Sequence, residues 1–247
     1  MKTFGLVIFF MVAALCFAQE SIPAGTILPV QLNSSLRSSK LHSGEAISGR
    51  VMQDVPLGYG LRIHAGAKVY GKVVEVTPAA SSSPGEVAFQ FDTLTEGKRH
   101  VAVSTNLRAM ASMMDVEEAQ VPATGPDRGT PEYFWTTEQI GGETNYHGGG
   151  PVTHGSEVVG KSVANGVLVR VSSAKSGCRN DGTGSNGTQA LWVFSSDACG
   201  LYGFPDLTIV HSGLKDPVGE IQIRSNKGDV NIRAGSGMLL RVDRRQR

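Results

Sequence analysis

Short apolar stretches separated by turn residues dominate the first half of the chain, with the spacing typical of an antiparallel barrel or sandwich. Val87, Phe89 and Phe91 alternate with small or polar neighbours, which predicts a strand with one buried and one solvated face. Thr95–Lys98 places a glycine among polar residues and predicts a hairpin turn. The strands predicted in this block are residues 26–30, 46–51, 61–63, 69–76, 87–91 and 100–103.

A second strand-rich block follows an interruption. Leu107–Ala119 is rich in Ala, Met and Glu and predicts a short helix, while the Pro and Gly residues of 122–131 predict a linker. Beyond the linker, alternation at residues 221–223 and 230–232 predicts a two-stranded meander with one buried face. The strands predicted in the second block are residues 134–139, 167–172, 190–194, 207–210, 219–223, 230–233 and 238–242.

These patterns predict an all-β protein of two sheet domains. We expect a small N-terminal β-barrel over residues 21–105 and a C-terminal antiparallel β-sandwich or meander domain over residues 132–243. A short helix and a Pro/Gly linker, residues 106–131, would join them. A chain of 247 residues is long enough for two such cores.

The first eighteen residues predict export. Lys2 precedes the apolar run Phe4–Phe17, and Cys16–Ala18 offers small residues at the positions that a signal peptidase reads. The run is short for a bilayer span. We therefore expect residues 1–18 to be a cleaved signal peptide and the mature chain to carry no transmembrane segment. The protein would act in the periplasm, at the outer-membrane surface or outside the cell.

Composition narrows the function classes. Glycine occurs 31 times in 247 residues, about twice its usual share of roughly 7%, which favours turns and strands. Removing residues 1–18 would remove one of the 23 basic residues, leaving 22 against 22 acidic residues. A net charge near zero provides no field to attract nucleic acid or an anionic membrane.

Two cysteines remain after the predicted leader, Cys178 and Cys199. In an oxidising compartment such a pair favours a disulfide over two free thiols or a metal site. The bond would close a loop of about 20 residues and stabilise the fold by about 3 kcal/mol.

Gly155–Ser162 matches the phosphate-loop pattern G-x-x-x-x-G-K-[ST] letter for letter. Binding a phosphate this way needs a buried strand before the loop and a helix after it. The glycine-rich segment His147–Pro151 precedes the match, and Val163–Val167 turns toward a strand. We interpret the match as coincidental, with Lys161 on the surface, and expect neither a nucleotide nor another cofactor.

Glu143, His147 and His154 lie close together in a glycine-rich loop and suggest a metal site. The glycines at 141–142 and 148–150 forbid the helix that would bring Glu143 and His147 to one face. The spacing to His154 matches no zinc pattern. We therefore expect a solvated loop without a metal ion.

Few sequence motifs support nucleophilic catalysis. Ser172–Lys175 fits S-x-x-K, but neither K-T-G nor G-x-S-x-G occurs in the chain. A trio of Ser195, Asp197 and His211 is conceivable in space, as in many chains of this size. We expect no catalytic residue.

Four aromatic residues, Trp192, Phe194, Tyr202 and Phe204, cluster around Cys199 in the sequence. Aromatic side chains beside a disulfide are usually part of a core, as in sandwich domains. A ligand platform is the alternative.

The first block resembles the C-terminal β-barrel domain of the VirB10/TrbI family, the envelope-spanning scaffold of type IV secretion and conjugation machines. Ile22–Leu32 opens the match, Val51–Val55 continues it, and Ile63–Val73 closes it. The resemblance implies a shared barrel. The family's membrane anchor, Pro-rich stretch and pore-forming helical insertion have no counterpart in this sequence. Residues 132–243 resemble an exported acidobacterial-type family, through Gln189–Phe194 and Gly235–Val242, from which no function carries over.

The sequence thus predicts an exported, non-enzymatic structural or binding protein of the cell envelope. Its partners would be proteins or envelope components such as peptidoglycan, contacted through loops such as Gly141–Gly155. A hydrolase acting on envelope carbohydrate or peptide is one alternative and would need paired carboxylates such as Glu143 and Asp197. An accessory of a conjugation or type IV secretion machine is another.

Overall fold

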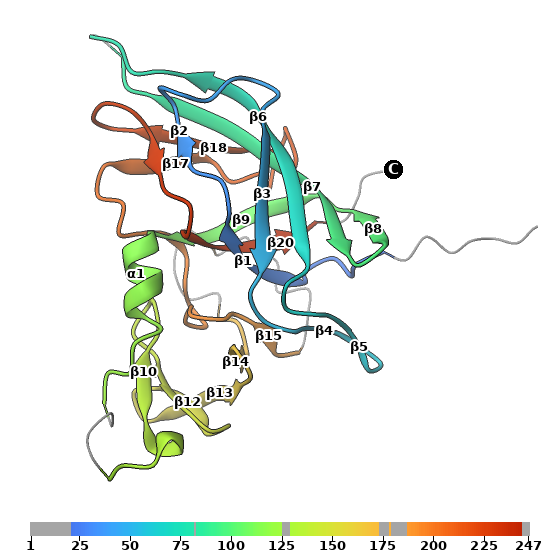
Figure 1. The fold of residues 1–247 in the computed structure, drawn as a ribbon, viewed down its shortest axis with the longest axis vertical. Coiled ribbons are helices and arrows are strands. Elements are labelled where there is room, and N and C mark those ends of the chain that lie inside the picture. The colour runs from blue at the N-terminus through green and yellow to red at the C-terminus, as the bar shows by residue number, and fades with distance from the viewer. Residues whose placement is uncertain (1–20, 82, 125–128, 173–177, 179–186, 244–247) are drawn as a thin grey trace, which may run out of the picture.

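The computed structural model describes residues 21–81, 83–124, 129–172, 178 and 187–243. The expected signal peptide, residues 1–18, lies outside these ranges, as does most of the S-x-x-K match. The described chain is nearly all β, as predicted. It forms a large sheet above a smaller one (Figure 1).

Ten strands form one nearly closed, barrel-like sheet. In spatial order, nine of them are β16 (Gly200–Tyr202), β9 (Thr105–Ala111), β20 (Gly237–Val242), β1 (Ile27–Leu32), β3 (Ala46–Val51), β6 (Lys68–Thr77), β7 (Glu86–Glu96), β18 (Ile221–Ser225) and β17 (Leu207–His211). The tenth, β8 (Arg99–Ala102), pairs with the C-terminal half of β7. Neighbours are antiparallel except β16 and β9, which are parallel.

Sequence alternation explains the strands of the first block. Val87, Phe89 and Phe91 of β7 are buried as predicted, and the two phenylalanine rings meet edge to face with centroids 6.0 Å apart. The strand predicted at 46–51 coincides with β3, and the predicted turn after Thr95 joins β7 to β8. The interior of the barrel is the larger hydrophobic core.

The helix predicted over Leu107–Ala119 is wrong for its first half. Thr105–Ala111 is strand β9, and only Met113–Glu118 form the helix α1, where the Ser112 hydroxyl accepts from the Asp115 N–H at 3.2 Å. All seven residues of β9 are buried, so burial on both faces overrides the helix propensity of Ala and Met. Among the described residues no helix is long and apolar enough to cross a membrane.

A second sheet of six strands follows the order of the chain. Its strands are β10 (Thr136–Glu138), β11 (Thr144–Tyr146), β12 (Pro151–His154), β13 (Glu157–Val163), β14 (Gly166–Val169) and β15 (Gln189–Ala190), preceded by the 3-10 turn η1 (Glu132–Phe134). This sheet is an antiparallel meander, as predicted for the second block. The segment expected to be a glycine-rich loop therefore contains β11 and β12.

Two short pairs complete the fold. β4 (Val55–Gly58) and β5 (Leu61–Ile63) form a hairpin that projects from one end of the barrel-like sheet (Figure 1). β19 (Asn231–Ile232) pairs with β2 (Leu36–Arg37). The predicted meander of residues 221–223 with 230–232 is wrong, because β18 pairs with β17 and β7 instead.

Strand pairing crosses the boundary predicted between the two blocks. β1 pairs with β20, with Ile27 opposite Arg241, and β18 pairs with β7, with Ile221 opposite Phe89. Residues 132–243 thus provide β16, β17, β18 and β20 to the barrel-like sheet besides forming the six-stranded sheet. The N-terminal block closes its barrel only with these later strands.

The two layers share a second hydrophobic core. Adjacent residues of β1 face opposite sides: Leu28 points into the barrel, while Ile27 packs with Trp192 and Phe194 in the second core. The small outward residue Ala109 of β9 belongs to the same second core. Both faces of these strands are therefore covered, which explains their nearly continuous apolar sequences.

Candidate binding cleft

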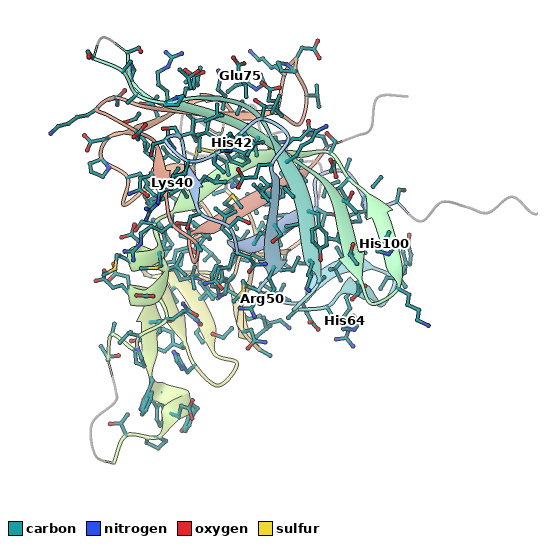
Figure 2. All side chains as sticks on the ribbon, turned by 45° about the horizontal axis from the view of Figure 1, so that its top comes forward. Lys40, His42, Arg50, His64, Glu75 and His100 are labelled. Carbon is teal, nitrogen blue, oxygen red and sulfur yellow. A yellow bond between two sulfur atoms is a disulfide. The ribbon has the colours of Figure 1, made fainter. Side chains whose placement is uncertain are left out.

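A cleft of about 1060 Å³ lies where the barrel-like sheet faces the six-stranded sheet. Arg50 and Val51 at the end of β3 form one wall, and Asn145 and Ser162 of the smaller sheet form another. Figure 2 shows Arg50 at the end of the large sheet that faces the smaller one. Segments between Arg50 and Val193 that are far apart in the sequence therefore meet at this cleft.

Gln53, just after β3, fastens the two layers together beside the cleft. Its side chain is fully buried and its amide oxygen accepts from the Trp192 N–H at 2.8 Å and from the Val167 N–H at 3.2 Å. The amide nitrogen donates to the Val167 carbonyl at 2.6 Å. Gly166 is required here, because a Cβ at that position would lie 2.3 Å from the Gln53 oxygen. One glutamine of the barrel thus satisfies three main-chain groups of the smaller layer.

Trp192, which is 5% exposed, lines the cleft. Its φ is +54°, a left-handed conformation that is costly for a bulky residue. Gln53 holds its N–H, and the Gln139 amide nitrogen donates to its carbonyl at 3.2 Å. Two buried glutamines therefore clamp the strained residue on both sides.

Tyr133 of η1 stands at the rim with 55% of its surface exposed. Its ring lies against Phe134, with centroids 3.9 Å apart and planes inclined by 35°. Gly148 packs against the base of this side chain, where a Cβ would come within 2.4 Å of the Tyr133 Cβ. The glycine-rich segment thus lets the backbone approach this aromatic side chain closely.

Polar groups line the rest of the cleft with little net charge. The Ser162 hydroxyl donates to Asn145, and the Gln120 amide donates to the Val116 carbonyl at 2.9 Å. Gln139 is 3% exposed, and its Oε1 has no hydrogen-bond partner among the described residues. The lining carries Arg50 as its cation, Glu132 as its carboxylate and His147.

The phosphate-loop match does not form a phosphate loop. Gly155 lies in the turn between β12 and β13, and Glu157–Val163 is strand β13, so no helix follows. Lys161 is exposed on that strand. The backbone of a paired strand cannot curl around a phosphate.

Glu143 is fully buried, which corrects the expectation of a solvated loop. Its carboxylate accepts from the Ser196 backbone N–H at 2.9 Å and from the Ser196 hydroxyl, and His154 Nδ1 lies 3.6 Å from Oε1. His147 does not join them but lines the cleft. In the described ranges, no three His, Cys, Asp or Glu side chains are placed to hold a metal ion.

This buried cluster is not ordered like a nucleophilic triad. In a triad the histidine lies between serine and carboxylate, whereas Glu143 lies between Ser196 and His154. The Ser195 hydroxyl donates to Asp197 at 2.7 Å, but His211 Nδ1 lies 2.7 Å from the Glu220 carbonyl oxygen instead. Neither Glu143 nor Asp197 lines the cleft.

The predicted disulfide is confirmed between Cys178 and Cys199, whose Cα atoms are 6.0 Å apart. The core interpretation of the nearby aromatics is confirmed for Trp192 and Phe194, which are 5% and 0% exposed. The Tyr202 hydroxyl accepts from the Cys199 N–H at 3.1 Å.

Sequence reasoning missed Gln53, Tyr133, Arg50 and Gln139. A glutamine in a strand-rich region is ordinarily a surface residue, so nothing local marks Gln53 or Gln139. Tyr133 follows a proline-rich linker, and only the glycine-rich segment fifteen residues later hints at close packing. The chain matches no family model, and no curated protein matches it.

Proposed function

We propose that the protein is an exported, envelope-associated binding protein and that the cleft between its two sheets is the binding site. The cleft carries the proposal: it is a preformed hollow of about 1060 Å³ lined by Trp192, by the exposed Tyr133 and by several polar side chains. Ligand sites commonly combine apolar walls with a few convergent polar groups. The expected leader and the disulfide both suit an oxidising compartment.

A hydrolase is less well supported by the same geometry. Glu143 and Asp197, the carboxylates that such an enzyme would use, bind Ser196 and Ser195 and do not line the cleft. Glu132, the carboxylate in the lining, has no carboxylate opposite it there to complete an acid–base pair. The barrel-like sheet is what the VirB10/TrbI resemblance implies, but no feature of the cleft favours a secretion role over general envelope binding.

Gln120→Trp tests the proposal, because Gln120 is exposed, follows α1 and lines the cleft, so an indole there would fill it. Glu117→Trp is the matched control, since Glu117 is exposed on α1 but does not line the cleft. The purified chain without residues 1–18 is mixed with isolated bacterial envelopes and sedimented. We expect wild type and Glu117→Trp to sediment with the envelopes and Gln120→Trp to stay in solution. If none of the three sediments, the proposed function is wrong; if Gln120→Trp sediments like wild type, the binding site lies elsewhere.

A further inference from the structure

We infer that the cleft binds an oligosaccharide segment of an envelope glycan, with Tyr133 as the face on which one sugar ring stacks. This inference rests on the proposed function and adds the ligand class. The volume of about 1060 Å³ lies just above the range of about 300–1,000 Å³ found for small-molecule sites. A cleft of this size has room for several linked rings rather than a single small metabolite.

The rim aromatic is held in place before any ligand arrives. The Tyr133 ring lies against Phe134, and the backbone at Gly148 packs against the Tyr133 Cα and Cβ, yet 55% of the residue remains exposed. A large aromatic surface left open adds little to folding but offers a flat apolar face to a partner. The C–H face of a pyranose ring fits such a face, and a preset ring keeps the entropic cost of binding low.

The remaining lining suits hydroxyl and acetamido groups. The side chains of Gln120, Asn145, Asn165 and Thr137 provide amides and a hydroxyl around the hollow. Amides donate and accept together, which matches sugar hydroxyls and the amide of an N-acetylated sugar. We therefore expect an N-acetylated glycan to bind better than one without amide groups.

Charge argues against nucleic acid and against a strongly anionic polymer. Arg50 is offset by Glu132 in the same lining. Tracking a polyanion requires several cations along a groove. The affinity should therefore change little with ionic strength.

Backbone pairing argues against an extended peptide. A peptide that binds as an added strand needs a free sheet edge. The cleft residues Asn145 and Ser162 belong to β11 and β13, and each of these strands is paired on both sides. The edge strand β10 also lines the cleft through Thr137, and on its outer side Thr136 already exchanges main-chain hydrogen bonds with Thr124.

The test is calorimetric titration of the purified mature chain with β-1,4-linked N-acetylglucosamine oligomers about four sugars long, chosen to span the cleft. Tyr133→Ala should weaken binding by about three- to tenfold, the usual range for losing one aromatic contact, and Tyr133→Phe should bind like wild type. Raising the salt from about 50 to about 500 mM should leave the affinity unchanged.

Two glycine variants test whether the position of the Tyr133 ring, and not only its presence, matters for binding. Gly148→Ala would push against Tyr133, whereas Gly155→Ala, outside the cleft lining, has nothing within 4 Å of its new Cβ. Both glycines have positive φ, +70° and +59°, so the backbone strain is similar. We expect Gly148→Ala to weaken binding of the same oligomer and Gly155→Ala to leave it unchanged.

The failures of the two proposals are distinguishable. If the oligomers give no heat while the chain still sediments with envelopes in a Gln120-dependent way, the glycan inference is overturned and the binding function stands. Equal affinities for Tyr133→Ala and Tyr133→Phe would overturn the stacking role. If the wild-type chain binds neither the oligomers nor the envelopes, both proposals are overturned.

Discussion

Gln53→Ala should be among the most damaging single substitutions outside the hydrophobic cores. The change removes a fully buried side chain that bonds the Trp192 N–H, the Val167 N–H and the Val167 carbonyl. Each buried polar group left without a partner costs about 1–3 kcal/mol. The Val167 carbonyl keeps a hydrogen bond from the Leu191 N–H at 3.3 Å, so two main-chain N–H groups lose their partner and we expect a total loss of about 3 kcal/mol.

The assay is equilibrium unfolding in urea, followed by tryptophan fluorescence and by circular dichroism. With a slope of about 2 kcal/mol per molar, a loss of about 3 kcal/mol lowers the midpoint by about 1.5 M. Trp192 and Trp135 are the only tryptophans in the chain, and Trp192 sits directly against the altered site. The fluorescence transition should therefore report the change.

Gln31→Ala is the matched control. Gln31 lies on neighbouring strand β1 and is only half-buried; its amide donates to the Gly235 carbonyl and accepts from the exposed Arg50 guanidinium, both over a long 3.3 Å. Its loss should cost no more than about 1 kcal/mol. Equal midpoint shifts for Gln53→Ala and Gln31→Ala would refute the idea that Gln53 fastens the layers.

Gln53→Glu adds a second, independent check. The shape is preserved, but at neutral pH a carboxylate oxygen would face the Val167 carbonyl, where the native amide donates at 2.6 Å. Protonation at low pH restores a donor. The difference in stability from wild type should therefore be large near neutral pH and smaller in acid, a trend that simple loss of packing would not produce.

Two further predictions concern covalent and acid stability. Reduction, or Cys178→Ser, should lower the free energy of unfolding by about 3 kcal/mol and the melting temperature by about 6–12 °C, and reductant should have no further effect on the variant. Because Cys199 directly precedes β16 of the barrel-like sheet, the unfolding transition of the whole molecule should move, not that of the second block alone. An unchanged melting curve would contradict this prediction. Partial burial raises the pKa of Glu96, but hydrogen bonds from the His64 N–H and ring, with the charges of His64 and Arg99, more than offset it and hold the pKa below 4.5. This carboxylate therefore stabilises the fold above about pH 4.5, and the contribution is lost as the pH falls through the folded pKa of Glu96. In urea titrations, wild type should lose more stability than Glu96→Gln between about pH 6 and about pH 3. Equal losses in the two proteins would contradict this prediction.

Local pattern predicted where most barrel strands lie, including β20, predicted at residues 238–242 although it pairs with β1 near the other end of the chain. Alternation and turn residues place β3, β5 and β7 nearly where the structure has them, because each is half-buried and bounded by glycine or a polar turn. The class of fold follows from the same signals. These signals depend only on nearby residues, so they carry no information about distant pairing.

The failures share one cause, which is contact between distant segments. The local sequence of β9 favours a helix, but the segment is a strand covered on both faces: Ala109 faces the second core and Met110 the barrel interior. The sequence around Glu143 predicts a solvated loop residue, because its hydrogen-bond partner Ser196 lies fifty-three residues later in the chain. The cleft needs Arg50, Tyr133 and Trp192 together, and no pattern in the sequence brings them to one place.

The same covering layer makes the barrel and the cleft interdependent. Gly237 opens β20, the strand that pairs with both β1 and β9, and a Cβ there would lie 3.2 Å from the Trp192 ring. The Trp192 ring therefore lies against the backbone of one barrel strand, while the Trp192 backbone is held by Gln53, which follows another. A shift of either layer would move Trp192 relative to Tyr133 in the cleft lining. The buried polar contacts between the layers thus give the molecule one arrangement of the cleft, and that fixed geometry makes recognition of a rigid ligand physically reasonable.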